Sequence, residues 1–478
     1  MSLILNKLRQ ITELRQTAGS SVLSEAKAKT DEEKLIIEMK ISLPKNVEKI
    51  INALYAAGYE AYAVGGCVRD SILGRVPNDW DITTSAKPED VKKIFRRTVD
   101  TGLKHGTVTV LIGKEMYEVT TYRIDGEYED SRHPKSVEFT ANLKEDLLRR
   151  DFTINAMAYN DSEGLVDIFG GMDDIDKKII RCVGNAKERF TEDALRLLRA
   201  VRFAAQLGYE IESETYEAIK ELAPTLSRIS AERIQAELNK ILLSDNPAML
   251  KTAYKLGLTK EFLPEIDKCF ETEQHNPHHC YSVGDHIIKS VENIEKTKAL
   301  RLSMLLHDIA KPECLTTDEK GIDHFHGHQM KSAQKAKEIL RRLKYDNDTI
   351  DMVYKFVRYH DERLDEGTKI MRHAMNRIGV EAFPDIFKVW KADLEAQSDY
   401  LREEKFERLN KNIEAYEEIK AKDECVSLKD LAVSGKDLIE KGIPSGPAIG
   451  EILNKMLEEV IENPEANDKE YLLNKYLK

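Results

Sequence analysis

The chain has 478 residues, of which 41% are hydrophobic and 33% are charged, and at roughly 150 residues per domain this length predicts three or four folded units. The composition excludes a fibrous protein and a generally disordered chain. With 73 basic and 85 acidic residues the formal charge is −12, which argues against binding a polyanion by overall charge, although local basic clusters can still hold one.

The sequence contains no signal for a membrane or an oxidising compartment. No apolar run reaches the ~18 to 20 residues that span a bilayer, and Asn6 and Lys7 interrupt the start before a signal-peptide core could form. The six cysteines lie far apart without a CxxC pair, so we expect neither disulfides nor a zinc ribbon. We predict a cytoplasmic protein without a membrane partner, and the oligomeric state stays open.

The residue pattern changes along the chain and predicts five segments. Residues 1–38 are polar and predict a loosely held extension. Residues 39–174 mix helical periodicity with alternating strands, which predicts a small α/β head. Strands then almost vanish, and the helical spacing predicts an all-α neck at 175–245, a helical domain at 246–410 and a helical tail at 411–478.

The most informative stretch of the head is AVGGCVRDSILGRVPNDWDITTS. A strand leads into Gly65 and Gly66, and a helix comes next. Glycines let the backbone approach a phosphate closely, and Arg69 offers positive charge beside it. A Gly-Gly turn alone usually means only a turn, so this motif gains weight only from the acidic residues that come after it in the same stretch.

A second strand is predicted to carry Asp79 and Asp81. Because side chains alternate along a strand, the two carboxylates would project from the same face. Such a pair suits Mg²⁺, which prefers one or two carboxylates supplemented by phosphate oxygens and water. Glu118, on another predicted strand, is a candidate third acid. A solvated strand edge is the alternative interpretation of each acid alone, but the combined spacing favours a metal and phosphate site.

Together with later segments, these motifs resemble the nucleotidyltransferase family that contains tRNA CCA-adding enzymes and poly(A) polymerases, in the class found in bacteria and eukaryotes. The later segments are LLRRDFTINAMAYN, DSEGLVDIFGGMDDI, EDALRLLRAVRFA and SAERIQAELNKIL. The resemblance runs from Met39 to the C-terminus. It implies that Asp79 and Asp81 hold catalytic Mg²⁺, that Gly65, Gly66 and Arg69 belong to the nucleotide site, and that Arg150, Asp151 and Asn155 fix the ribose and phosphates.

The resemblance also implies that Asp193 and Arg196 read the base. If they lie on one helix, Asp193, Arg196 and Arg199 are spaced i, i+3 and i+6, so Arg199 is on a nearby face and is a further candidate for nucleotide binding. Asp193 would accept from the exocyclic amine of cytosine or adenine while Arg196 donates to the adjacent ring nitrogen. UTP and GTP present the wrong polarity, so we expect them to be rejected. Without these motifs an exposed ion pair would be the simpler interpretation.

The activity implied is template-independent addition of CCA to the 3′ end of tRNA from CTP and ATP, by two-metal nucleotidyl transfer. A poly(A) polymerase of this family typically has a basic GRRF-like stretch after the paired aspartates, which VDTGLKHGTVTV lacks. The loop at 123–137 resembles the flexible element of enzymes that add the final adenosine. A poly(A) polymerase and an A-adding tRNA nucleotidyltransferase remain the alternatives.

A second constellation, in the helical domain, resembles the HD phosphohydrolase superfamily. Its residues in chain order are His286, His307, Asp308, His328, His360 and Asp393. Imidazole and carboxylate ligands together suit Mn²⁺, Ni²⁺ or Fe²⁺, which can activate water against a phosphoester. Related two-domain proteins imply phosphatase or 2′,3′-cyclic phosphodiesterase activity. Two alternatives stay open: an inactive RNA scaffold, and an HD phosphohydrolase whose head is a degenerate RNA-binding module.

The tail contains the segment KGIPSGPAIG at residues 441–450, with glycine-bearing turns before a predicted helix. Backbone N–H groups at such turns can contact RNA phosphates. A plain connection between helices is the alternative, so tRNA contacts of the tail are a possibility that the sequence leaves open.

Overall fold

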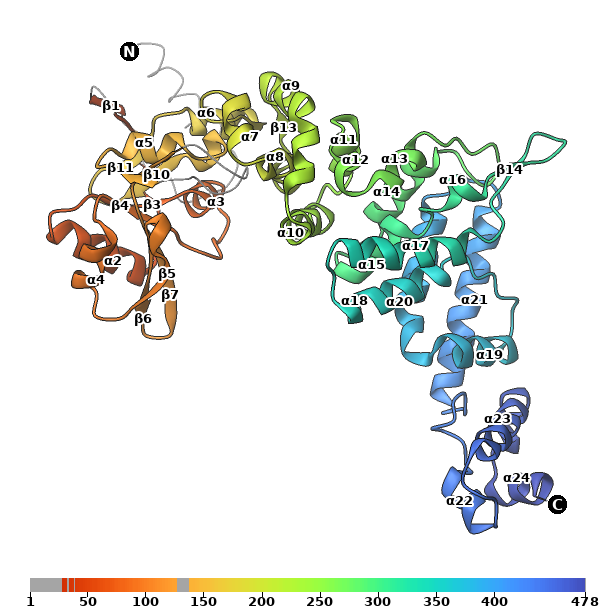
Figure 1. Cartoon of the computed structure of the whole chain (residues 1–478). Helices are drawn as coiled ribbons and strands as arrows, with labels where there is room; N and C mark the ends of the chain where they lie inside the picture. The colour runs from red at the N-terminus through yellow and green to blue at the C-terminus, as the bar shows by residue number, and fades with distance from the viewer. Residues whose placement is uncertain (1–27, 32–33, 38, 127–136, 478) are drawn as a thin grey trace. The chain divides into compact units, whose positions relative to one another are not determined.

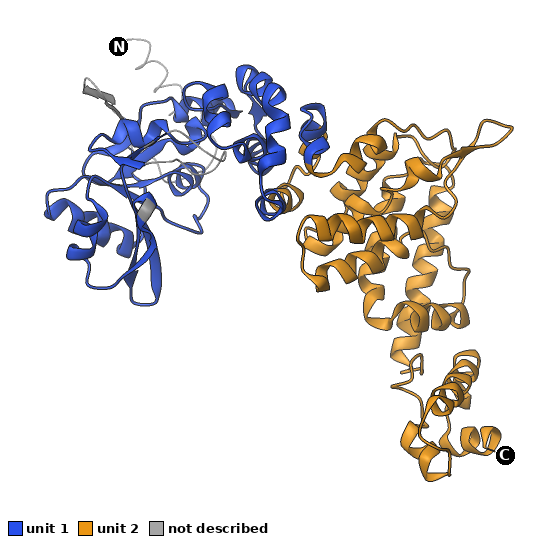
Figure 2. Cartoon of the chain, in the orientation of Figure 1, with its two compact units in different colours: residues 1–237, 252–261 blue, residues 238–251, 262–478 orange. Residues whose placement is uncertain are grey.

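The computed structural model describes residues 28–31, 34–37, 39–126 and 137–477 (Figure 1). Most of the expected extension, and most of the loop predicted at 123–137, lie outside the described residues. The chain forms two compact units, one of residues 1–237 with 252–261 and one of residues 238–251 with 262–478 (Figure 2).

The first unit is built on one sheet, in which nine described strands follow the order β1-β2-β11-β10-β3-β4-β7-β6-β5. Their bounds are Ala28–Asp31 (β1), Lys34–Ile37 (β2), Ala61–Val64 (β3), Ile82–Thr84 (β4), Thr98–Gly102 (β5), Thr107–Ile112 (β6), Glu115–Thr121 (β7), Met157–Asn160 (β10) and Gly164–Asp167 (β11). Neighbouring strands pair antiparallel except β4 and β7, which are parallel. β1 and β2 precede residue 39, so the end of the expected extension supplies sheet strands.

Short helices surround this sheet. They are α2 (Lys45–Ala56), α3 (Gly66–Ile72), α4 (Pro88–Ile94), α5 (Leu143–Leu148) and α6 (Gly171–Lys177), with a 3₁₀ turn at Thr153–Asn155 and a small hairpin of β8 (Arg123–Asp125) and β9 (Val137–Phe139). α2 buries Val47, Ile50, Ile51 and Leu54, the spacing of an amphipathic helix with one face on a core. A core that includes Tyr62, Tyr122 and Leu147 closes around β3 and β10.

Helices dominate from residue 186 onward. The neck elements are α7 (Ala186–Glu192), α8 (Leu195–Leu207), α9 (Ser213–Leu222), α10 (Ala231–Leu242), α11 (Met249–Lys255) and α12 (Thr259–Phe262), with β12 (Ile179–Ile180) paired to β13 (Glu210–Ile211). α8 buries Leu197, Leu198, Val201 and Ala205, which is again helical spacing.

The second unit contains α13 (Pro264–Phe270), α14 (Val283–Asn293), α15 (Lys298–Leu306), α16 (Lys311–Cys314), α17 (His328–Arg342), α18 (Asn347–Arg358), α19 (Thr368–Ile378), α20 (Phe383–Glu395), α21 (Arg402–Ala421), α22 (Gly435–Glu440), α23 (Pro447–Glu462) and α24 (Lys469–Tyr476), with a hairpin of β14 (Thr316–Thr317) and β15 (Asp323–His324). The last three helices share a small core that includes Leu438, Met456 and Leu472. The predicted fold class, an α/β head followed by helices, is confirmed. No described helix combines the length and apolarity that a membrane crossing requires.

Candidate functional site

Asp79, Asp81 and Glu118 line one cleft of about 1160 Å³ in the head, together with Lys45 and Lys49 of α2. β4 pairs with β7 so that Ile82 faces Val119, which sets Glu118 level with Asp81. The third acid predicted from the sequence therefore lies beside the paired aspartates.

The expected strand position of the two aspartates needs a correction. β4 begins at Ile82, so Asp79 and Asp81 precede it. The Asp81 carbonyl accepts a hydrogen bond of 3.0 Å from the Val64 N–H, which continues the pairing by one residue. Asp79 precedes these residues, since the register of β3 with β4 runs from Thr84 to Ile82, so it lies outside the strand pairing. Strand alternation therefore does not by itself align the two carboxylates.

The acids influence one another electrostatically. Partial desolvation by the walls of the cleft raises the pKa of Asp81, Arg150 lowers it in part, and Asp79 raises it again. Partial desolvation, Asp81 and Asp79 together raise the pKa of Glu118. Crowded carboxylates of this kind are stabilised by a divalent cation, which removes their mutual repulsion. The residues present therefore fit such an ion, although their oxygens do not form one of the tight ligand clusters found among the described residues.

The turn after β3 brings an arginine close to the backbone. Gly65 has φ +84°, and a Cβ atom placed there would lie 3.1 Å from Nη1 of Arg150. A side chain at this position would therefore be strained and would crowd Arg150. Gly66 begins α3, and Arg69 lies in the same helix.

Four of the predicted nucleotide-binding side chains form one hydrogen-bonded chain. Arg69 Nη1 donates to Asn155 Oδ1 at 2.5 Å, and Asn155 Nδ2 donates to Asp151 Oδ1 at 3.1 Å. Arg199 Nε donates to Asp151 Oδ2 at 2.9 Å. Burial alone would raise the pKa of Asp151, but Arg199 and Asn155 hold it well below its ordinary range. The network therefore keeps Asp151 ionised and fixes both arginines.

The predicted base-reading pair is placed differently from the expectation. Asp193 ends α7 and precedes α8, where its Oδ1 accepts from the N–H of Leu195 at 3.0 Å. It is not one helical turn from Arg196 on a continuous helix, because the chain bends between α7 and α8. Arg196 instead donates to Glu192 Oε2 at 2.7 Å and to the Arg149 carbonyl at 2.8 Å.

Sequence reasoning missed the residue that fixes Asp193. Arg233 of α10 donates from Nη2 to Asp193 Oδ2 at 2.7 Å. The segment SAERIQAELNKIL contains this arginine, and its position within a motif of the same family was the available signal. The Asp193 carboxylate is therefore oriented by two donors, one on each oxygen.

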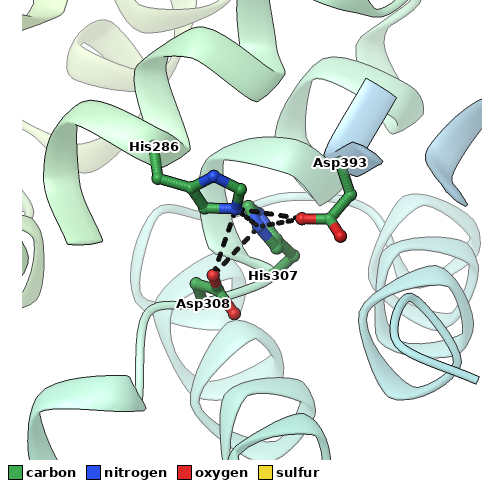
Figure 3. Close-up of side chains that lie close together, drawn as sticks. All are labelled: His286, His307, Asp308 and Asp393. Atoms are coloured by element: carbon green, nitrogen blue, oxygen red, sulfur yellow. Dashed lines mark hydrogen bonds and ion pairs between the residues drawn. The ribbon is translucent and has the colours of Figure 1, made fainter. Parts of the chain in front are cut away.

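The fold brings all six residues of the second constellation together, and Figure 3 shows His286, His307, Asp308 and Asp393 among them. His286 lies on α14 and Asp393 on α20, His307 and Asp308 follow α15, His328 begins α17, and His360 follows α18. All six side chains are buried. His286, His307, Asp308 and Asp393 form one group of potential ligand atoms, and Asp308, His328 and His360 form another, each with its atoms within 4.8 Å of one another.

Asp308 links the two groups. Its Oδ2 lies 3.4 Å from His286 Nε2 and 3.2 Å from His307 Nε2, and its Oδ1 lies 3.2 Å from His328 Nε2. Both oxygens are buried, and Oδ2 also has the ammonium group of Lys311 at 2.7 Å. Because Asp308 belongs to both groups of potential ligand atoms, its two oxygens fit a bridge between two metal ions.

The four imidazoles are oriented by the backbone. Their Nδ1 atoms lie 2.7 to 3.2 Å from the carbonyl oxygens of Ala396, Met304, Phe325 and Val357. Because a carbonyl can only accept, each Nδ1 carries the proton and each Nε2 keeps a lone pair for a metal. The donor set therefore fits the transition metals expected from the sequence.

Two further residues beside this cluster were not predicted. Lys311 Nζ lies 2.7 Å from Asp308 Oδ2, and the lysine is buried. The rings of His279 and His286 lie 5.2 Å apart, and burial together with Lys311 lowers the pKa of His279 to about 2. The helical i, i+3 spacing of Asp308 and Lys311 was the available signal for the lysine. A cavity of about 540 Å³ lies over the cluster and reaches both residues.

Comparison with known proteins identifies the family. Residues 61–181 match the poly A polymerase head domain, residues 208–270 match an RNA- and SrmB-binding region of polymerase A, and residues 315–476 match tRNA nucleotidyltransferase domain 2. The CCA-adding enzyme of Limosilactobacillus reuteri is 37% identical over 428 residues, which are 89% of this chain and 94% of that protein. That of Ligilactobacillus salivarius is 37% identical over 437 residues, which are 91% and 95% of the two chains.

A solved structure agrees with these relatives. The crystal structure of the Bacillus stearothermophilus CCA-adding enzyme in complex with CTP superposes with a TM-score of 0.66 at 30% identity, and the match covers 91% of this chain and 98% of that one. Since both the sequence and the fold agree over nearly the whole length, the chain belongs to the family of CCA-adding enzymes, which are tRNA nucleotidyltransferases.

Proposed function

We propose that the protein adds CCA to the 3′ end of tRNA, using CTP and ATP without a template, in the cytoplasm. The observation that carries this proposal is the cleft that gathers Asp79, Asp81 and Glu118, where neighbouring acids raise the pKa of Asp81 and of Glu118. Three mutually repelling acids at the surface do not stabilise the packing of the head. In nucleotidyl transfer, such acids are needed to hold the metal ions. The relatives of similar length are named CCA-adding enzymes.

In this proposal Asp79 and Asp81 hold Mg²⁺, and Glu118 completes the acidic cluster. When bound, the ions would activate the primer's 3′-hydroxyl and neutralise the triphosphate, so that pyrophosphate leaves. Arg150, beside Gly65, is placed to meet the phosphates. Arg69 and Arg199 are fixed through Asn155 and Asp151, so the cationic walls are formed before the nucleotide binds.

Base selection is assigned to Asp193 and Arg196. Asp193 is already oriented by Arg233 and the Leu195 N–H, and its remaining lone pairs can accept from the amine of cytosine or adenine. Arg196 is engaged with Glu192 and the backbone. These bonds use three of the five N–H donors of the guanidinium, so in this proposal the other donors serve the ring nitrogen.

The test is to incubate the protein with tRNA that lacks its terminus, labelled CTP and ATP, and Mg²⁺, and to sequence the products. Addition of CCA is expected. Adenosine added only to tRNA ending in CC would indicate an A-adding enzyme, and long adenosine tails a poly(A) polymerase. No incorporation under any condition would refute the transferase function and favour a hydrolase with a degenerate head.

A second function is favoured by the buried cluster around Asp308. We propose that this site hydrolyses phosphoesters, with His286, His307, Asp308 and Asp393 holding one metal ion and Asp308, His328 and His360 holding another. When bound, Mn²⁺, Ni²⁺ or Fe²⁺ would supply an activated water. Lys311, next to Asp308 and facing the cavity, is placed to contact a phosphate oxygen.

The hydrolase is tested with purified protein reconstituted with each metal and assayed on bis(p-nitrophenyl) phosphate and 2′,3′-cyclic nucleotides. Metal-dependent turnover that survives Asp79→Ala is expected, because that substitution removes only the head activity. Bound metal without turnover on any phosphoester would refute the hydrolase function and leave the domain as a scaffold.

A further inference from the structure

A second cavity opens from the metal cluster toward α21. Its volume is about 350 Å³, at the lower end of the range of about 300 to 1,000 Å³ typical of small-molecule sites. It shares His360 and Asp393 with the larger cavity over the cluster. α20 and α21 lie side by side in this region (Figure 1). A molecule that places one end at the cluster can therefore extend its other end into this cavity.

The walls of this second cavity combine apolar groups with charges of both signs. The apolar residues include Leu364, Trp390, Leu394 and Leu409, the cationic ones are Arg363, Lys405 and Arg408, and the acidic ones besides Asp393 are Asp361, Glu362 and Glu404. Lys405 Nζ donates to Gln397 Oε1 at 2.9 Å, and Gln397 Nε2 donates to Asp393 Oδ2 at 2.7 Å. Two hydrogen bonds thus link Lys405 in the cavity wall to Asp393, a predicted metal ligand. Apolar walls suit a flat ring, and cations beside the cluster suit a phosphate.

One polar group in the wall lacks a partner. Asn412 of α21 is 3% exposed, and among the described residues its Oδ1 atom accepts no hydrogen bond. A buried carbonyl oxygen left without a donor is unfavourable, because it has lost the hydrogen bonds that water would make. A ligand that donates to it would remove this cost. Since the side-chain amide also carries N–H donors, Asn412 can pair with an edge that offers a donor next to an acceptor, as every nucleobase does.

We propose that this cavity is a base-binding subsite and that Asn412 recognises the hydrogen-bonding edge of a nucleobase whose phosphate lies at the metal cluster. The inference rests on the hydrolase function proposed above and names its substrate as a nucleoside phosphoester. It also makes α21, a helix without predicted metal ligands, a determinant of specificity.

Binding can be measured without metal and without turnover. The chain has two tryptophans, Trp80 and Trp390, and Trp390 lines the cavity. In the full-length Trp80→Phe protein, the tryptophan fluorescence therefore comes from Trp390 alone. We expect adenosine or uridine to change this emission saturably. N6,N6-dimethyladenosine and 3-methyluridine, which lack the N–H donor, should bind at least about tenfold more weakly.

The variant Asn412→Leu keeps the size of the side chain and removes its hydrogen bonds. It should abolish the preference for the unmethylated nucleosides. Asn410→Leu is the matched control, since Asn410 is exposed on the same helix and does not line the cavity. Equal binding of methylated and unmethylated nucleosides, or no response to any nucleoside, would overturn the proposal.

A kinetic measurement separates this proposal from the hydrolase function and avoids the Trp80 substitution. Asn412→Leu should raise KM for 2′,3′-cyclic nucleotides about tenfold and leave KM for bis(p-nitrophenyl) phosphate unchanged. An equal rise for both substrates would overturn the subsite alone. Nucleoside binding as predicted, with no phosphoester hydrolysed, would refute the hydrolase and retain the subsite.

Discussion

The head and the helical body hold their acidic residues in opposite ways. In the head, Asp79, Asp81 and Glu118 are exposed in a wide cleft and their oxygens do not converge. In the body, Asp308 and Asp393 are buried among four histidines whose orientations are fixed by backbone carbonyls. For the two proposed metal sites, this difference predicts that ions reach the head together with a nucleotide, whereas the body would keep its ions resident.

The largest effect is expected at the head. Asp79→Ala should reduce CCA incorporation by at least about 1,000-fold, because the ions lose a ligand at the reacting phosphate. Incorporation of labelled CTP into truncated tRNA measures this effect, and Asp100→Ala is the control, since Asp100 forms an exposed ion pair with Lys92. Retained hydrolase activity in Asp79→Ala would show that the two sites are independent. Unchanged incorporation would contradict the proposed role of the acids.

In the body, removing the bridging carboxylate should empty both metal positions. We expect Asp308→Asn protein to retain less than one equivalent of metal after dialysis and to lose at least about 100-fold of its hydrolase activity. Metal analysis by mass spectrometry gives the stoichiometry. Asp385→Asn, at an exposed ion pair with Lys388, should bind metal like the wild type. If Asp308→Asn also kept its full metal content, the proposed bridge would be wrong.

The buried pair of Asp151 and Arg199 in the head should contribute to stability. Asp151→Asn breaks the buried pair with Arg199 and should lower the free energy of unfolding of the head by about 3 kcal/mol. Because the folded-state pKa of Asp151 lies below its ordinary value, this contribution is present above the ordinary pKa and is lost as the pH falls through the folded-state value. Urea denaturation at pH 7 and pH 3 should show a smaller difference at the lower pH; an equal difference would contradict the linkage.

Base selection should give a more moderate effect. Asp193→Ala removes the acceptor for the amine of cytosine and adenine, so the preference for CTP over UTP should fall by about 10- to 100-fold. Arg233→Met, which leaves the Asp193 carboxylate with one donor fewer, should give a smaller loss of the same kind. Single-nucleotide incorporation with each triphosphate distinguishes a loss of selectivity from a uniform loss of rate, which would indicate misfolding instead.

The smallest effect is expected from Asp81 in the head, on the stability of the fold. The pKa of Asp81 is raised in the folded protein, so its ionised form opposes folding above the ordinary pKa of aspartate. Asp81→Asn should therefore raise the free energy of unfolding at pH 7, without metal, by a small amount, because solvent screens the charge of this exposed residue, and the gain should vanish at low pH. Thermal unfolding at pH 7 and pH 3 checks this sign. A lower Tm at pH 7 would mean that Asp81 stabilises the fold rather than serving the reaction.

Much of this protein was determined by its sequence. Helical spacing and strand alternation were sufficient to predict an α/β head followed by helices, because the periodicity of buried side chains is a local property. The paired aspartates, and the succession of histidines along the chain, were sufficient to predict the candidate sites, since ligand chemistry depends on residue type.

Contacts between residues that are far apart in the sequence became visible only in the tertiary structure. It placed Asp193 at a break between two helices and joined it to Arg233, 40 residues away. It made Asp308 a bridge between histidines from four segments. It also left the Oδ1 atom of Asn412 without a donor among the described residues, at a cavity wall. No local pattern records these pairings, because the partners meet only after the chain has packed.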